Sequence, residues 1–132
     1  MSGARLIDNW SDYANFSEDE FRCKHTGQCH MHPEFMARLQ RLRDAYGKPM
    51  QITSGFRHRT HPIEARKATP GAHAMGRACD VAVTGADAIR LIVLAAELGF
   101  TGIGVQQKGE GRFIHLDDVP GSILPRPALW SY

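Results

Sequence analysis

The chain has 132 residues, of which 42% are hydrophobic and 23% are charged. This length and balance predict one globular domain spanning residues 1–132. The net charge of +2 is too small to argue for a nucleic-acid partner, and no apolar run approaches the roughly 18 residues that a membrane span needs. The N-terminus lacks the apolar core of a signal peptide, so we expect synthesis in the cytoplasm without a leader.

The first half of the chain predicts two helices, a strand and a long loop. Ser17 and Glu20 form a capping-box pattern, which predicts that a short helix starts there. The segment 33–47 begins with proline, carries apolar residues at helical spacing and ends with glycine, so we expect an amphipathic helix. A short strand over 49–54 follows. The loop 55–76 is rich in Pro, Gly and His and exceeds the roughly 12–15 residues of ordinary connections, which is typical of either a functional or a disordered loop.

The second half predicts more strands than helices. Short apolar runs indicate strands over 79–83, 102–106 and 112–117, and the segment 85–99 reads as a buried helix. We expect the Pro-rich tail 120–132 to pack back onto the body. Helices and strands do not alternate regularly enough for a doubly wound parallel sheet. The order therefore predicts an α+β fold, with a small antiparallel or mixed sheet and helices packed on one face.

Side-chain alternation along two of these strands places polar groups on a shared surface. In the strand 79–83 the apolar side chains face the core and Asp80 faces away from it. In the strand 112–117, His115 and Asp117 face away from the core in the same manner. If the two strands are neighbours, Asp80 and His115 lie on one surface.

His73 can reach that surface from the loop that precedes the strand. Two imidazoles and one carboxylate around an open position are typical of a catalytic zinc site. Each residue also has an ordinary interpretation: a histidine as a satisfied polar group, and Asp80 as the cap of a turn. Spacing alone leaves both interpretations open.

Three motifs together resemble a known family. They occur in the order SGFR (54–57), HAMGRACD (73–80) and FIHLD (113–117). They are similar to the zinc D-alanyl-D-alanine carboxypeptidase and endopeptidase family, whose fold is shared with the hedgehog signalling domain. The opening NFSEDEFRC and the tail RPALWSY resemble small phage-encoded members. The resemblance extends over the chain from Asn15 to Tyr132.

The resemblance implies that His73, Asp80 and His115 bind Zn²⁺. It implies that Arg57 holds a substrate carboxylate, a carbonyl oxygen or the developing oxyanion, because a guanidinium matches such groups. A structural salt bridge is the alternative for Arg57. The basic residues of the same loop form either a solvated surface or a cationic rim that attracts a carboxylate: Arg57, His58, Arg59, His61, Arg66 and Lys67.

The implied activity is hydrolysis of a peptide bond in bacterial peptidoglycan, by a monomer that acts in the cell wall or periplasm, with delivery by a phage as one route. The bond could be a terminal D-alanine bond or one within a stem peptide or cross-link. A catalytically weak or inactive module of the same fold is the alternative. A non-haem iron oxygenase is a further alternative, because His115 and Asp117 form a His-x-Asp pair, but no histidine follows His115.

The chain departs from the family pattern at the position of the general base. Several members carry Glu three residues before the last histidine, where this chain has Arg112. Others carry His two residues before it, where this chain has Phe113. Asp117 is the candidate base because it shares a strand face with His115. Its alternative role is to accept the ring N–H of that histidine and fix its orientation. Glu110, in a predicted turn, is a third candidate.

A second cluster of possible metal ligands lies in CKHTGQCHMH, residues 23–32. Its two cysteines and three histidines could supply four ligands, but no second half-site with finger spacing follows. We interpret this stretch as a structured loop. A disulfide between Cys23 and Cys29, or a second metal ion, are the alternatives. The chain has three cysteines, an odd number, which argues against a complete disulfide framework.

Overall fold

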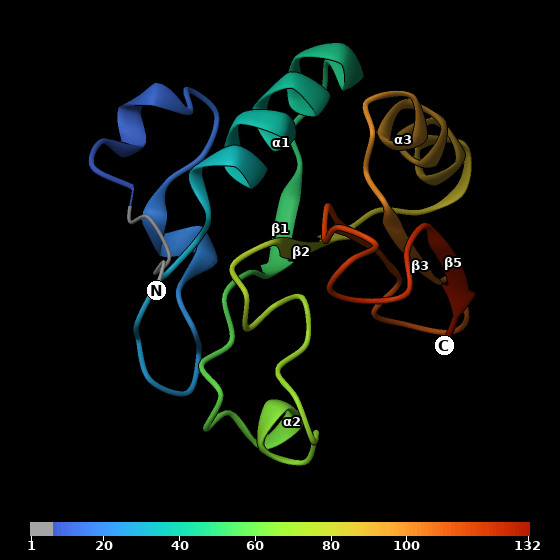
Figure 1. Ribbon diagram of the computed structural model, residues 1–132. Coiled ribbons are helices and arrows are strands. Elements are labelled where there is room, and N and C mark those ends of the chain that lie inside the picture. The colour runs from blue at the N-terminus through green and yellow to red at the C-terminus, as the bar shows by residue number, and fades with distance from the viewer. Residues whose placement is uncertain (1–6) are drawn as a thin grey trace.

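The computed structural model describes residues 7–132, and its centre is one mixed sheet of five strands in the order β1-β2-β4-β3-β5 (Figure 1). The strands are β1 (Gln51–Ser54), β2 (Ala78–Ala82), β3 (Gly102–Gln106), β4 (Phe113–Asp117) and β5 (Ala128–Ser131). The pairs β1–β2, β2–β4 and β3–β4 are antiparallel, whereas β3–β5 is parallel. The predicted α+β fold with a small mixed sheet is confirmed.

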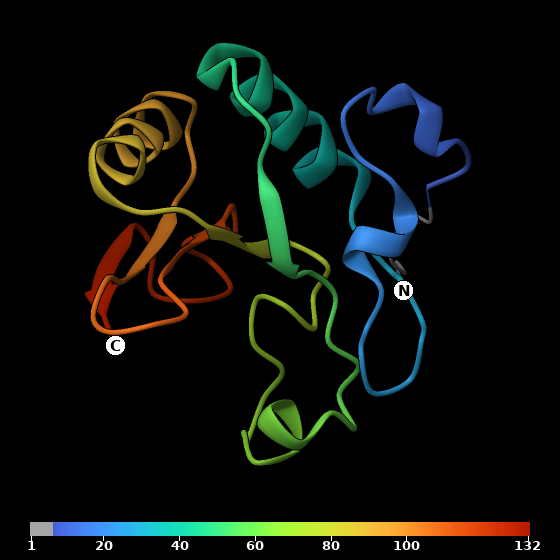
Figure 2. The same cartoon turned by 180° about the vertical axis from the view of Figure 1, so that it is seen from behind.

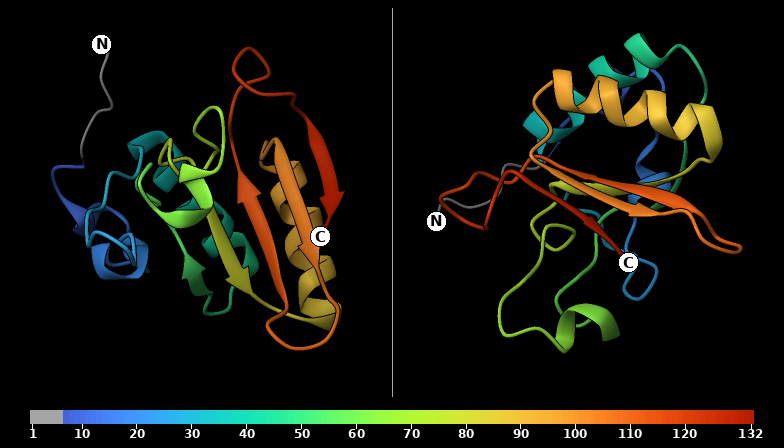
Figure 3. Two further views of the ribbon diagram at one scale, coloured as in Figure 1. Left: turned by 90° about the horizontal axis from the view of Figure 1, so that it is seen from below. Right: turned by 90° about the vertical axis from the view of Figure 1, so that its right-hand side faces the viewer.

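The two faces of the sheet are covered differently. The long helices α1 (Pro33–Tyr46) and α3 (Gly85–Glu97) lie together on one face, as the right-hand view of Figure 3 shows. The long loop and its short helix α2 (Pro62–Ala65) lie on the opposite side. Two short 3₁₀ helices, Trp10–Asp12 and Glu18–Phe21, precede α1. No helix within the described residues is both long and apolar enough to cross a membrane.

The hydrophobic core lies between the sheet and the two long helices. Its central members are Leu39 and Leu42 of α1, Leu91 and Ala95 of α3, and Cys79, Val81, Ile114 and Leu116 of the sheet. The alternation of β2 and β4 thus sends apolar side chains to the helices, as predicted. The residues between them, Asp80 and His115, point to the opposite face. Burial of the apolar face therefore determines which face can carry the polar groups.

The local signals read from the sequence form where they were expected. The backbone N–H of Ser17 donates to the Glu20 carboxylate at 2.8 Å, which completes the first turn of the 3₁₀ helix. At the start of α1, Nδ1 of His32 accepts from the backbone N–H of Glu34 at 3.1 Å. Gly47 caps the C-terminal end of the helix, with a φ of 74° that glycine adopts readily.

Three elements were not predicted: the 3₁₀ helix Trp10–Asp12, α2 and β5. The loop contains α2, a single turn in which the backbone N–H of Ile63 donates to Nδ1 of His61 at 3.1 Å. The tail forms β5, which pairs with β3 at the edge of the sheet and is seen from behind in Figure 2. The segment 128–131 lacks a strong alternating pattern, because its pairing is decided by the neighbouring strand β3 rather than by local sequence.

Candidate metal centre

Three polar side chains converge on the face of the sheet that the helices leave open. Asp80 on β2 and His115 on β4 are directly paired in the antiparallel register, and His73 approaches from the turn before β2. All three are buried, with exposed fractions of 4–6%. Their ligand atoms lie within 4.8 Å of one another and could hold a metal ion.

The outer ring nitrogen of His73 is held by the backbone. Its Nδ1 lies 2.8 Å from the carbonyl oxygen of Gly55, so Nδ1 carries the proton and donates. Nε2 is then left with its lone pair toward Asp80 and His115. Gly55 has no room for a side chain, because a Cβ there would lie 2.7 Å from Cα of Phe21. The glycine of the SGFR motif therefore permits close packing against Phe21, and its carbonyl oxygen accepts the hydrogen bond that orients His73.

His115 has the opposite ring orientation. Its Nε2 lies 2.7 Å from Oδ2 of Asp117, which accepts the ring proton. Its Nδ1 is then the atom with a lone pair, and it lies 3.2 Å from Nε2 of His73 and 3.2 Å from Oδ1 of Asp80. Each histidine thus has its outer nitrogen bonded to an oxygen acceptor, which is the usual second contact of a metal-binding histidine.

The three donor atoms fit a metal ion. The remaining pair, Nε2 of His73 and Oδ1 of Asp80, is separated by 3.3 Å. Ligand atoms about 2.0–2.1 Å from a tetrahedral zinc ion are separated by roughly 3.3 Å, which matches all three pairs. Two imidazole lone pairs that face each other repel unless a cation lies between them. The chemistry and the spacing of this set therefore suit zinc or a similar ion.

The charges in the centre follow from burial and from the short contacts. Burial would raise the pKa of Asp80, but the close approach of the His115 and His73 rings outweighs it and lowers that pKa far below its usual value. Burial lowers the pKa of His73, which favours the neutral ring that a metal requires. Burial acts in the same direction on His115, but its contacts with Asp117 and Asp80 raise its pKa.

A cleft of about 630 Å³ opens above the three ligands. Its walls carry three basic side chains and three aromatic ones: Arg57, Lys67, Arg126, Phe113, Trp130 and Tyr132. The aromatic residues come from β4 and from the tail, where Tyr132 packs on Phe113 with ring centroids 5.2 Å apart. The tail therefore does pack back onto the body, as expected, and it forms one wall of the cleft.

Arg57 lies beside the centre, between two carboxylates. Its guanidinium is 3.5 Å from Oδ2 of Asp80 and 3.7 Å from Oε2 of Glu64, and 17% of its side chain is exposed. Both contacts are longer than a good hydrogen bond. The guanidinium thus keeps hydrogen-bonding capacity toward the cleft. This placement is consistent with a role in binding an anionic group. Arg57 also forms the salt bridges, to Asp80 and Glu64, that the alternative interpretation requires.

Asp117 lies on the far side of the His115 ring from the other ligands. It is fully buried and accepts hydrogen bonds from Nε2 of His115, from Arg126 and from the backbone N–H of Val119. Hydrogen bonds from His115 and Arg126 overcome the effect of burial and lower its pKa to about 2. This geometry favours the orienting role over that of a general base. An iron site of the His-x-Asp type would need Asp117 and His115 to bind the same ion. Asp117 instead lies at Nε2 of His115, on the side of the ring away from His73 and Asp80.

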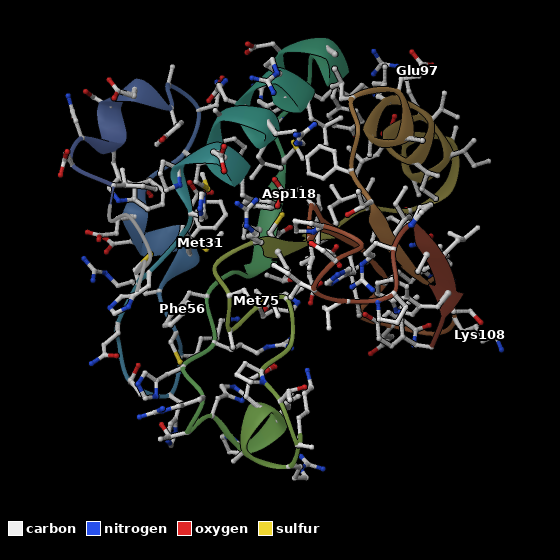
Figure 4. The ribbon with its side chains drawn as sticks, viewed as in Figure 1. Met31, Phe56, Met75, Glu97, Lys108 and Asp118 are labelled. Carbon is white, nitrogen blue, oxygen red and sulfur yellow. The ribbon has the colours of Figure 1, made fainter. Side chains whose placement is uncertain are left out.

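The remaining candidate base, Glu110, does not line the cleft. It is exposed in the turn between β3 and β4. Lys108 of the same turn projects from the edge of the molecule in Figure 4.

The cysteine- and histidine-rich stretch 23–32 has structural roles. Sγ of Cys23 accepts from the backbone N–H of His58 at 3.3 Å, and the His30 ring stacks on Phe56 at 5.1 Å. His32 caps α1. All three cysteines are free, and among the described residues the only metal-binding group of three or more is His73, Asp80 and His115. The interpretation as a structured loop agrees with these contacts.

Sequence reasoning missed Arg126, Trp130 and Glu64 as parts of this region. Arg126 and Trp130 lie in the tail motif RPALWSY, for which the sequence predicts packing onto the body but no role at the metal centre. Glu64 is a buried residue of α2 within the basic loop, where it binds Lys67 and the backbone N–H of Gly71. The signal in the sequence is that Glu64 is an acidic residue among the many basic residues of the loop 55–76.

The family comparison agrees with this geometry. A family model described as Peptidase M15 matches residues 14–117, more than three quarters of the chain, and includes all three ligand candidates. None of the curated proteins matches the chain.

Proposed function

The chain belongs to the Peptidase M15 family, and from that membership and the geometry of the centre we propose that it is a zinc peptidase of bacterial peptidoglycan. Its substrate would be a peptide bond in the stem peptides or cross-links, cut by carboxypeptidase or endopeptidase action. The protein would act as a monomer in the cell wall or periplasm, with phage delivery as one route.

One observation carries this proposal. The lone pairs of two oriented imidazoles and one carboxylate meet at the floor of a cleft whose walls are basic and aromatic. Three protein ligands leave a coordination position open, which distinguishes catalytic from structural zinc sites. Basic walls suit a peptide that carries carboxylates, as peptidoglycan stem peptides do.

The residues of the chain have separate roles in this scheme. His73, Asp80 and His115 would hold the ion, and a zinc ion in such a site acts as a Lewis acid and activates water near neutral pH. Arg57 would hold a substrate carboxylate or the oxygen on which negative charge develops. Gly55 and Asp117 keep the outer ring protons of the two histidines in place, so that neither ring has to reorient during the reaction.

A second candidate function is supported by the composition of the cleft. Asp80 is the only carboxylate among the described residues that line it, so no separate general base is apparent there. The same site could therefore serve as a zinc-dependent binding module with weak or no hydrolysis. The two functions share the metal site and differ in turnover.

Mass spectrometry of purified peptidoglycan fragments distinguishes them. The fragments are incubated with zinc-loaded protein, with and without a chelator. Chelator-sensitive products would support the peptidase, and their masses would identify the bond. Unchanged fragments, together with zinc-dependent retention of the protein on peptidoglycan, would favour the binding module.

A further inference from the structure

The tail of the chain, after the end of the family match at residue 117, reaches back to the metal centre. We infer that Arg126 is a positioning residue of this centre, which acts through Asp117 to hold the ring of His115 for metal binding. The inference rests on the proposed metal site and assigns a role to a residue outside the matched region.

Arg126 holds Asp117 through the Nε–Nη2 edge of its guanidinium. Its Nε lies 3.0 Å from Oδ1 and its Nη2 lies 2.8 Å from Oδ2. Such a two-point contact fixes the plane of the carboxylate as well as its position. Oδ2 also accepts from Nε2 of His115 at 2.7 Å. The orientation of the carboxylate therefore determines the orientation of the imidazole.

The acceptor sites of Asp117 are all engaged by groups that keep it in place. Oδ1 accepts a further hydrogen bond from the backbone N–H of Val119 at 3.3 Å. The side chain of Asp117 is completely buried, whereas 11% of the Arg126 side chain is exposed. A buried carboxylate without its guanidinium partner would be strongly destabilised, so it would move or take up another partner. The His115 ring would then lose its fixed acceptor.

Packing holds Arg126 over this contact. The guanidinium lies 5.2 Å from the ring of Trp130, and that ring lies 5.0 Å from the ring of His115. Trp130 thus packs against both Arg126 and His115, the two residues that Asp117 connects. Gly102 and Gly104 of β3, which are register partners of Asp117 and His115, leave the space that the Asp117 carboxylate and the Trp130 indole occupy. A side chain at either glycine would collide with them.

The test is the affinity of the purified full chain for Zn²⁺, measured by competition with a chelating dye. Arg126→Gln removes the charge and the two-point contact. Arg126→Lys keeps the charge but cannot bind both carboxylate oxygens at once as the guanidinium does. We expect Arg126→Gln to raise the dissociation constant about 10- to 100-fold, as for other residues that orient metal ligands, and Arg126→Lys to have a smaller effect. If Arg126→Gln does not fold, the zinc affinity of Arg126→Lys still tests the inference.

The second readout is the visible absorption spectrum of the Co²⁺-loaded protein, which reports the arrangement of the ligands rather than stability. We expect Arg126→Gln to change this spectrum. A merely structural role would lower the unfolding midpoint of the metal-free protein without altering the spectrum.

Arg77→Gln is the matched control. Arg77 binds the next carboxylate in the chain, with Nη1 3.0 Å from Oδ1 of Asp118, and 17% of its side chain is exposed. Asp118 is also buried, but it lies beneath α1 in Figure 4 and binds Arg77 and Arg38 rather than a ligand histidine. We expect Arg77→Gln to destabilise the fold and to leave zinc affinity and the Co²⁺ spectrum unchanged.

Three results would overturn the inference. Zinc affinity and a Co²⁺ spectrum of Arg126→Gln equal to those of the wild type would show that Arg126 does not position the site. An equal loss of affinity in Arg77→Gln would assign the effect to general destabilisation. Failure of the wild-type protein to bind either ion would instead overturn the proposed metal site, and this inference with it.

Discussion

Asp80 and His115 are direct partners on neighbouring antiparallel strands, and Oδ1 of the aspartate lies 3.2 Å from Nδ1 of the histidine. Their separation is thus determined by the hydrogen-bonding ladder of β2 and β4 and does not depend on a flexible loop. Only His73 reaches the centre from a turn, and the backbone of Gly55 holds it there. A site with two ligands on the sheet is preorganised for a metal ion.

Removal of one ligand tests the centre directly. We expect His115→Ala to lose stoichiometric zinc and all chelator-sensitive cleavage of peptidoglycan fragments, because two ligands cannot hold the ion firmly. Elemental analysis and the fragment assay measure both effects. His25→Ala, which removes an exposed histidine, is the control. Full activity of a folded His115→Ala protein would exclude His115 as a ligand.

The space above Gly104 is needed by Trp130. A Cβ at this position would lie 2.6 Å from Nε1 of Trp130, so we expect Gly104→Ala to destabilise the protein by about 1–3 kcal/mol through overpacking. Urea unfolding measures the loss. In the background of Trp130→Ala the same substitution should cost much less, because the colliding ring is absent. Equal costs in both backgrounds would contradict this explanation.

Arg57→Lys separates charge from geometry in the basic loop. The variant keeps the positive charge but loses the planar guanidinium, which can donate to two oxygens at once. We therefore expect kcat/KM for peptidoglycan fragments to fall by about 10²–10³. Arg59→Lys makes the same change two residues away, at an exposed side chain that does not line the cleft, and should have no effect. Similar losses in both variants would indicate a general effect of the loop.

Buried Glu64 predicts a pH-dependent contribution to stability. Burial would raise its pKa, but hydrogen bonds from Gly71 and Lys67 lower it below the ordinary 4.5. A group whose pKa is lower in the folded state stabilises the fold above the unfolded-state pKa, and this contribution is lost as the pH falls. We expect Glu64→Gln to cost about 1–3 kcal/mol at pH 7.

That cost should shrink as the pH falls below 4.5, the ordinary pKa of the carboxyl group. Urea unfolding of both proteins at pH 7 and at lower pH measures the difference. A cost that is constant over the whole range would show that the charge of Glu64 does not matter.

The cysteine- and histidine-rich stretch should not bind a second zinc ion. Cys23 is buried and already accepts a hydrogen bond from the His58 backbone. We therefore expect one zinc ion per chain, and the same stoichiometry in the double variant Cys23→Ser/Cys29→Ser. Elemental analysis of dialysed protein measures it. Two ions in the wild type and one in the double variant would place a second site in this stretch.

Local sequence was sufficient for most elements and for the face on which the site lies. The proline and glycine that bound α1, and the alternation in β2 and β4, are short-range signals that survive in the fold. The alternation alone placed Asp80 and His115 away from the core, and the spacing of His73 placed it within reach. The family resemblance, confirmed by the match over residues 14–117, identified the motifs.

Only the tertiary structure decided how these residues are held. Which nitrogen of His73 and of His115 faces the centre depends on Gly55 and Asp117, and alternation carries no information on ring orientation. The role of Arg126 depends on the return of the tail along β3, a pairing between residues distant in sequence. Sequence periodicity reports which side of a strand a residue occupies, whereas hydrogen-bond partners across the fold are determined by packing. The sequence alone therefore determined the candidate ligands, and the folded chain determined their orientation.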